Sequence, residues 1–179
     1  MGSMVRHRFR VEEVEALGAL HPELRLELLD GEVYEMAPPS SEHAGLLDWL
    51  LFVLGPRVAG LAQLRVQSPL RLSEESLLLP DLLLLKPRED FYTQAHPGPE
   101  DVLLLVEVSL STEAWDREKK LPLYARAGLP EVWLLTREGL EVHREPREDR
   151  FHRRFRIAKG EKIAPLLLPQ AAFLFQPPL

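Results

Sequence analysis

The segments LLLPDLLLLK (residues 77–86) and DVLLLVEVS (residues 101–109) decide the fold, because each is a nearly unbroken apolar run with one carboxylate inside it, Asp81 or Glu107. Leucine and valine runs that are apolar on both faces indicate strands of a sheet that is covered on both sides. An ionised carboxylate in such a strand must be paired, hydrogen-bonded or bound to a metal, because its desolvation is otherwise costly or raises its pKa. Two such carboxylates on adjacent strands therefore predict one shared ligand.

The segments on either side of these runs carry signals for helices and further strands. Ser40 or Ser41 is expected to cap one helix, and Ser111 or Thr112 another. Asp30-Gly31 between two alternating segments predicts a hairpin with a type I′ turn. The expected elements are a helix at 11–20, strands at 24–29 and 32–36, a helix at 41–60, strands at 64–72, 78–85 and 102–108, a helix at 112–127 and a strand at 132–135. This order indicates an α/β fold with a mixed sheet.

The chain of 179 residues is expected to form one domain, residues 1–179, with its core at 24–135. Residues 136–179 add a hairpin and an apolar, proline-broken tail that suits packing on the body or on a partner subunit. Cysteine is absent, which excludes disulfide frameworks, thiolate zinc sites and cysteine nucleophiles. No secretory signal or membrane-length apolar stretch is visible, so we expect a cytoplasmic protein without membrane contact. The lack of asparagine and the abundance of arginine, glutamate and proline are typical of thermophilic usage.

The predicted helix at 112–127 brings a cation near the two acids. Asp116 and Lys120 are four residues apart and share one helix face, so one ammonium group is expected to lie near the ends of the strands. Two carboxylates suit Mg²⁺, with Mn²⁺ as a substitute, because these hard ions prefer oxygen ligands, and a lysine stabilises charge on a phosphate. The pattern favours a divalent-metal hydrolase of phosphodiesters. Trp115 and Tyr124 are interpreted as packing residues.

At these residues the chain resembles a known group of nucleases. Pro80-Asp81, followed on the next strand by Glu107, is similar to the motif of the PD-(D/E)xK restriction-endonuclease superfamily. The segments RLELLDGEV, SSEH, LPDLLLL, VEVSLST and DREKKLPLYARAGLPEVWLL together resemble the putative restriction endonucleases of the Uma family, over roughly residues 24–135. The resemblance implies a restriction-endonuclease-like αβββαβ core, here with an N-terminal hairpin and a C-terminal β extension.

The resemblance also implies roles for individual residues, and it gives the metal-ligand role to Asp81 and Glu107. Where the superfamily has a lysine two residues after the second acid, this chain has Ser109. The lysine is then expected from the following helix, as Lys120 in the family pattern Asp-x3-Lys-Leu-x2-Tyr. The candidate catalytic residues are Asp81, Glu107, Lys120, His43 in the first turn of the helix at 41–60, and Glu27 in the ELLDGE hairpin.

Each candidate also has a structural interpretation. Asp81 and Glu107 are alternatively buried carboxylates that arginine neutralises. Lys120 is alternatively part of a solvated helix face beside Lys119, and His43 is alternatively a solvent-facing or capping histidine. The sequence leaves these alternatives open.

The segment HREPREDRFHRRFRIAKGEK (residues 143–162) is rich in basic residues. On a strand, alternate residues would present arginines on one face, so Arg153, Arg154 and Arg156 are candidate contacts to phosphates. Acidic residues are interspersed, and the alternative is an edge hairpin held by salt bridges. Because the net charge is −6 and the pI is near 5.6, DNA binding would need such a local basic patch.

The sequence is interpreted as that of a metal-dependent endodeoxyribonuclease, in which a metal-activated water attacks a phosphodiester in line. Nucleases that address two strands often pair, so we expect a homodimer or a higher homo-oligomer. Two alternatives stay open. One is a catalytically inactive member of the fold that binds nucleic acid or protein, which Ser109 and the acidic pI favour. The other is a hydrolase of a small phosphoester, which a cavity too narrow for duplex DNA would favour.

Overall fold

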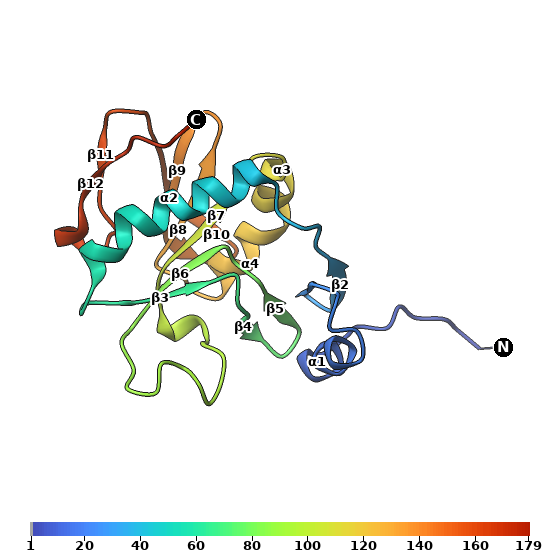
Figure 1. Cartoon of the computed structure of the whole chain (residues 1–179). Helices are drawn as coiled ribbons and strands as arrows, with labels where there is room; N and C mark the ends of the chain where they lie inside the picture. The colour runs from blue at the N-terminus through green and yellow to red at the C-terminus, as the bar shows by residue number, and fades with distance from the viewer. Residues whose placement is uncertain (1) are drawn as a thin grey trace.

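A six-stranded mixed sheet forms the centre of the structure, a computed structural model that describes residues 2–179 (Figure 1). Its strands lie in the order β10-β9-β8-β7-β6-β3. Their bounds are β3 Gln63–Val66, β6 Leu82–Leu85, β7 Val102–Val108, β8 Glu131–Thr136, β9 Gly139–Arg147 and β10 Arg150–Ile157. β7 and β8 pair in parallel and the other neighbours are antiparallel. The predicted α/β fold with a mixed sheet is therefore confirmed.

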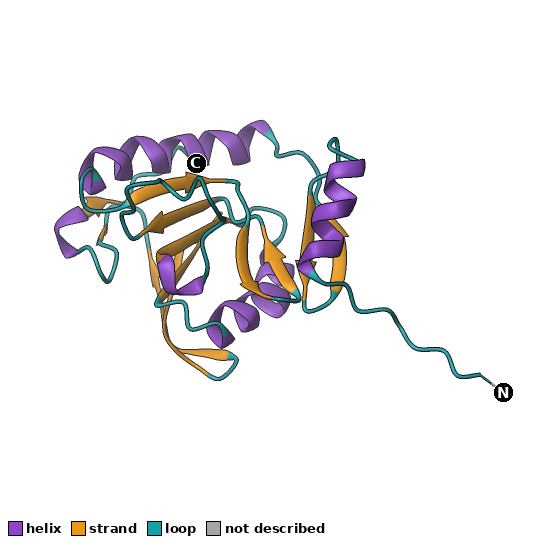
Figure 2. Cartoon of the chain, turned by 90° about the horizontal axis from the view of Figure 1, so that it is seen from below, coloured by secondary structure: helices purple, strands orange, loops and turns teal. Residues whose placement is uncertain are grey.

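Different helices cover the two faces of this sheet (Figure 2). α2 (Ser41–Val58) packs its buried leucines on one face, and helical residues 113–126 pack on the other. No helix of the described chain has both the length and the apolar character to span a membrane. Because successive side chains of a strand alternate between faces, Val106 of β7 lies toward α2, whereas Leu105 and Glu107 lie toward the other helix.

The crossover between β7 and β8 is helical, as predicted, but it contains one wide turn. It consists of α3 (Glu113–Trp115), the π-helical turn η2 (Asp116–Lys120) and α4 (Leu121–Arg126). The Leu121 N–H donates to the Asp116 carbonyl, five residues back. Pro122 follows at once, and proline has no N–H and crowds the carbonyl four residues before it, which favours a widened turn. Gly128 ends the segment with a φ of +79°.

A smaller sheet with the order β2-β1-β5-β4 lies beside the first. It contains β1 Leu26–Leu29, β2 Glu32–Glu35, β4 Leu70–Ser73 and β5 Ser76–Leu78, and α1 (Val11–Leu20) packs on it. Asp30 and Gly31 between β1 and β2 have φ values of +47° and +86°. A type I′ turn requires positive φ at both central residues, so the predicted hairpin is confirmed.

Two predicted strands, 64–72 and 78–85, are wrong as single elements. Each is divided into two strands that belong to different sheets, at Gln67 in the first case and at the segment before β6 in the second. Gln67 has a φ of +47°, and Pro80 cannot donate to a strand ladder. Asp81 therefore lies in a break between the two sheets and not inside a strand.

The C-terminal residues form the predicted hairpin and a tail. β9 and β10 pair over most of their length, with β10 at the edge of the sheet. The tail contains β11 Lys162–Ile163, η3 Pro169–Ala171 and β12 Phe173–Leu174. Outside the tail, one further short helix, η1 Pro99–Asp101, precedes β7. The tail buries Phe173 and Phe175 against the α2 side of the core. It thus packs on the body of the chain, and a homo-oligomer stays a prediction.

An ion pair between a partly exposed arginine and a buried glutamate attaches the crossover helix to the sheet. Arg117 of η2 donates to both carboxylate oxygens of Glu141 on β9, with Nε 3.1 Å from Oε1 and Nη2 2.6 Å from Oε2. Glu141 is 1% exposed, and His143 Nε2 lies 2.7 Å from its Oε1. Burial works to raise the pKa of Glu141, but the hydrogen bonds from His143 and Arg117 outweigh it and hold this pKa well below its usual range. The pair therefore fixes the turn that carries Asp116 and Lys120.

We expect Glu141→Gln to lower the free energy of unfolding by about 2 kcal/mol at pH 7, because Arg117 loses its two-oxygen carboxylate partner and keeps only Glu113, 3.3 Å away. A carboxyl group with a lowered pKa stabilises the fold above its ordinary pKa of about 4.3, and this contribution is lost as the pH falls toward its pKa in the folded protein. The difference between wild type and variant should therefore shrink from pH 5 to pH 2.5. Urea unfolding across this range measures it.

Glu138→Gln is the control, because Glu138 is exposed in the same hairpin and pairs only at the surface with Arg156. A difference between Glu141→Gln and wild type that does not change with pH, or an equal loss in Glu138→Gln, would contradict this account of the ion pair.

Candidate active site

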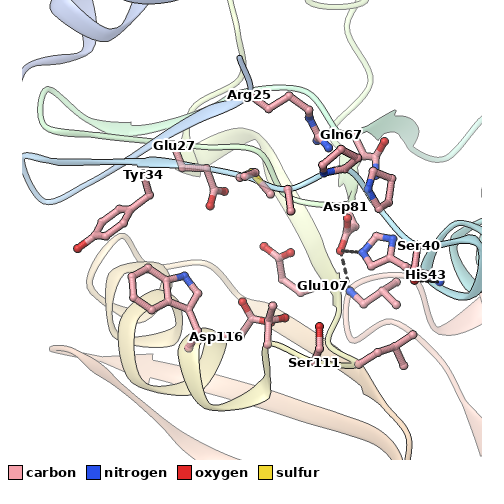
Figure 3. A pocket seen from close by; sticks show the side chains of 18 of the residues that line it. Arg25, Glu27, Tyr34, Ser40, His43, Gln67, Asp81, Glu107, Ser111 and Asp116 are labelled. Atoms are coloured by element: carbon pink, nitrogen blue, oxygen red, sulfur yellow. Dashed lines mark hydrogen bonds and ion pairs between the residues drawn. The ribbon is translucent and has the colours of Figure 1, made fainter. Parts of the chain in front are cut away.

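A cavity of about 480 Å³ lies where the two sheets meet the first turn of α2 (Figure 3). Its walls come from the β1–β2 hairpin and the loop after it, the start of α2, the break before β6, the end of β7 and the start of the crossover helix. The acidic, basic and histidine side chains that line it are Arg25, Glu27, Glu35, His43, Asp81, Glu107, Asp116 and Lys120. All five candidate catalytic residues of the sequence analysis are thus brought together in one cavity.

Asp81 is held by two hydrogen bonds at the break between the sheets. Its Oδ2 accepts from the Val108 N–H at 2.8 Å and lies 3.2 Å from His43 Nε2. Ser40 caps α2 by accepting the His43 N–H on its side chain, which places the imidazole in the first helical turn. The hydrogen bond to Asp81 raises the pKa of His43 and outweighs the opposing effect of burial. His43 therefore points at Asp81 and into the cavity (Figure 3).

Glu107 points from β7 toward the crossover helix. Its Oε1 accepts from the Tyr124 hydroxyl at 2.7 Å and lies 3.6 Å from Lys120 Nζ. Burial raises the pKa of Glu107 well above its usual value; Lys120 opposes this rise, and nearby carboxylates, Asp81 first among them, add to it. An additional cation near Glu107 would therefore favour the ionised form of its carboxyl group.

Lys120 is buried and surrounded by carboxylates. Its Nζ lies 3.1 Å from Glu27 Oε1 and 3.9 Å from Asp116 Oδ1, in addition to its contact with Glu107. Burial works to lower the pKa of Lys120, but these three carboxylates outweigh it and raise the pKa above its usual value. Lys120 is therefore a permanent positive charge at neutral pH, whereas the neighbouring Lys119 is exposed.

Glu27 connects the smaller sheet to this cluster. Its Oε2 accepts the Leu79 N–H at 2.8 Å, in the break that precedes Asp81, and also accepts from Lys120 at 3.2 Å. Glu27 is 2% exposed. The hairpin carboxylate therefore fixes both the ammonium group and the chain segment that leads to Asp81.

Sequence reasoning did not select Asp116 as a site residue. Its Oδ2 accepts from Ser109 Oγ at 2.5 Å and from Thr112 Oγ1 at 2.8 Å. Burial raises the pKa of Asp116, although Lys120 and these two hydroxyl groups oppose the rise. Ser109, two residues after Glu107, therefore orients Asp116 beside Lys120. The Asp-x3-Lys-Leu-x2-Tyr pattern contained the signal, and Tyr124 of this pattern packs in the core while it bonds Glu107.

Two carboxylates of the cavity are of the kind that small, hard divalent cations use as ligands. Within residues 2–179 no group of three or more acidic or histidine side chains is arranged to hold a metal ion. Mg²⁺ is commonly bound by one or two carboxylates, and water and substrate phosphate complete its coordination. Asp81 and Glu107 line the same cavity and supply two such carboxylates. Burial is the main cause of the raised pKa of Glu107, and a nearby cation would oppose the rise, as Lys120 does.

The three arginines predicted to contact nucleic acid lie away from this cavity, on the edge strand β10. Arg156 pairs with Glu138 at 3.1 Å, and Arg154 lies 3.5 Å from Glu141. Arg153 stacks over the Phe155 ring, with its guanidinium carbon 5.4 Å from the ring centre. Arg154 is thus partly neutralised by Glu141 of β9, and Arg156 by Glu138 of the turn between β8 and β9.

Comparison with known proteins gives two findings. Residues 11–174 match the family model of Uma2, which is described as a putative restriction endonuclease. The structure is similar to the crystal structure of a putative nuclease belonging to DUF820 from Anabaena variabilis, with a TM-score of 0.68 and 14% sequence identity over 90% of this chain and 91% of that chain. No curated protein matches the chain. At this identity the structural likeness shows a shared fold.

We expect Lys120→Met to lower the free energy of unfolding by about 3 kcal/mol at pH 7 without added metal, because it leaves the buried carboxylates without their cation. Lys119→Met is the matched control and should change stability by less than about 0.5 kcal/mol, since Lys119 is exposed. Urea unfolding of both variants makes the comparison. Equal stability of the two variants would show that Lys120 does not hold the cluster together.

Proposed function

Because the chain belongs to the Uma2 family of putative restriction endonucleases, we propose that it is a metal-dependent endonuclease that hydrolyses DNA phosphodiester bonds. One observation carries the proposal: Asp81, Glu107 and Lys120 come from separate elements and line the same cavity. Two carboxylates for a cation and one fixed ammonium group suit an anionic substrate whose negative charge increases during hydrolysis.

Asp81 and Glu107 are the residues that would hold Mg²⁺, with Mn²⁺ as a substitute. When bound, the ion supplies a water of lowered pKa and a positive charge beside the phosphate. The Val108 N–H and His43 fix Asp81, and Tyr124 fixes Glu107. The carboxylates are therefore oriented before a cation arrives, which limits the reorganisation that binding requires.

Lys120 acts through its charge and not as a base. Its raised pKa keeps it protonated near neutral pH, so its N–H groups can donate to a phosphate oxygen or to the attacking water. Glu27 positions Lys120, and His43 positions Asp81. Both are positioning residues in this proposal, because each acts through a group that would contact the cation or the phosphate.

A second candidate function has one specific observation in its favour. Asp81 and Glu107 are only 6% and 4% exposed, in a cavity of about 480 Å³. Cavities of roughly 300–1,000 Å³ hold small ligands, so the site also suits a hydrolase of a small phosphoester. Cleavage of p-nitrophenyl phosphate without cleavage of any DNA would favour this alternative.

The first test is calorimetric titration with Mn²⁺. Wild type should bind the ion, and Asp81→Asn and Glu107→Gln should weaken binding at least tenfold while the protein stays folded, because each variant removes a charged oxygen ligand. Asp48→Asn is the control, since Asp48 is exposed on α2 and does not line the cavity. Unchanged affinity in both site variants would overturn the assignment of the metal ligands.

The second test is DNA cleavage with Mg²⁺. Wild type should cut labelled DNA, chelation of the metal should stop the reaction, and Asp81→Asn and Lys120→Met should lower the rate at least a hundredfold. Gel electrophoresis of the products measures this. Cleavage that persists at the wild-type rate in Asp81→Asn would place the activity elsewhere.

A further inference from the structure

The two candidate metal ligands are buried side chains at the wall of a small cavity. Asp81 and Glu107 are 6% and 4% exposed, and both line the cavity. Stacking and pairing hold the phosphates of duplex DNA on the outside of a stiff helix, and enzymes that act in a narrow pocket must first extrude the nucleotide. A cavity of about 480 Å³ is of the size that holds one small ligand, and such a size suits one nucleotide better than a base-paired helix.

Part of the cavity wall is aromatic. Tyr34 of β2 and Trp115 of α3 both line the cavity, with their ring centres 4.8 Å apart and their planes at 73°. Both residues are half buried and pack against the core, as the sequence analysis expected for Trp115, and both keep part of their surface accessible. Aromatic rings that keep part of their surface accessible are platforms on which unpaired bases stack, because every base has a stacking face.

Arg25 supplies a cation without a protein partner. It is half buried and lines the cavity next to β1, yet its guanidinium group makes no ion pair or hydrogen bond within residues 2–179. Most arginines near the N-terminus behave differently, since Arg6, Arg8 and Arg10 all pair with glutamates. Figure 3 shows Arg25 reaching over the cavity toward Gln67, while Tyr34 lies at the opposite end and Glu107 lies between them. A guanidinium group without a protein partner at this point suits the binding of a phosphate of a nucleic-acid strand.

We propose that the cavity receives one unpaired nucleotide of a DNA strand, with its base against Trp115 and Tyr34 and a backbone phosphate on Arg25. The substrate is then single-stranded or splayed DNA and not intact duplex. This inference rests on the proposed nuclease function and names its substrate class. It also accounts for buried acids in a protein that acts on a polymer, because a flexible single strand suits a cavity of this size better than a duplex.

Fluorescence anisotropy tests the inference without catalysis. A short labelled DNA strand and a blunt duplex of the same sequence are titrated with the wild-type protein in Ca²⁺, with thymidine monophosphate as a competitor. We expect the single strand to bind at least tenfold more tightly than the duplex and than the mononucleotide. Equal binding of duplex, equal binding of the mononucleotide, or no binding of the strand would each overturn the inference.

Variants connect this preference to the named residues. Trp115→Ala and Arg25→Gln should each weaken binding of the strand about tenfold, and Trp115→Phe should retain most of it, because a phenyl ring still stacks. Phe52→Ala and Arg126→Gln are the controls, since both residues are exposed and lie outside the cavity. Thermal unfolding confirms that each variant is folded, and wild-type affinity in both site variants would contradict the proposal.

Cleavage of the same two DNA molecules in Mg²⁺ tests the nuclease function separately from the preference for a single strand. Absence of cleavage in both would refute the nuclease function, while the binding preference would still test the cavity. A duplex cut as fast as the single strand would refute the inference and leave the nuclease function in place.

Discussion

The site depends on a single buried ammonium group that three carboxylates share. Lys120 contacts Glu27, Glu107 and Asp116, and all four side chains are at most 4% exposed. Each carboxylate comes from a different part of the fold: the smaller sheet, β7 and the crossover helix. Removal of any of these charges from water is costly, so the cluster is stable only while its members stay together. Burial raises the pKa of Glu107 and of Asp116, and the charge of Lys120 opposes the rise in both.

Ordinary backbone features bring this cluster together. Alternation along β7 turns Glu107 away from α2 and toward the crossover helix, where Lys120 of η2 and Tyr124 of α4 contact it. The wide turn from Asp116 to Lys120 has both of its end residues on the site, and Arg117 within the same turn bonds Glu141 on β9. The helix is therefore held on the sheet by one charged residue of the turn while two others face the cavity. Rigid elements on every side leave little freedom to the groups that would act on a phosphate.

The buried acids and the other wall residues of the cavity have different functions in the proposed mechanism. In this proposal Asp81 and Glu107 would hold a cation. Arg25, Tyr34 and Trp115 would hold a nucleotide. The protein has a net charge of −6, so attraction of DNA from a distance is weak, and local contacts must supply the affinity. A substrate that inserts one flexible nucleotide makes such contacts without a broad basic surface, and two arginines of β10 are partly neutralised by neighbouring acids.

Local chemistry determined much of this protein from the sequence. Periodicity and turn residues predicted the helices, the β1–β2 hairpin and the mixed sheet, and a charge inside an apolar run pointed to Asp81 and Glu107. The tertiary structure alone decided that 64–72 and 78–85 each cross between two sheets, because a continuous apolar run does not reveal which neighbour each half pairs with. It also decided the partners of Lys120 and the free state of Arg25, since Glu27 and Lys120 are 93 residues apart and sequence spacing reports only neighbours along the chain.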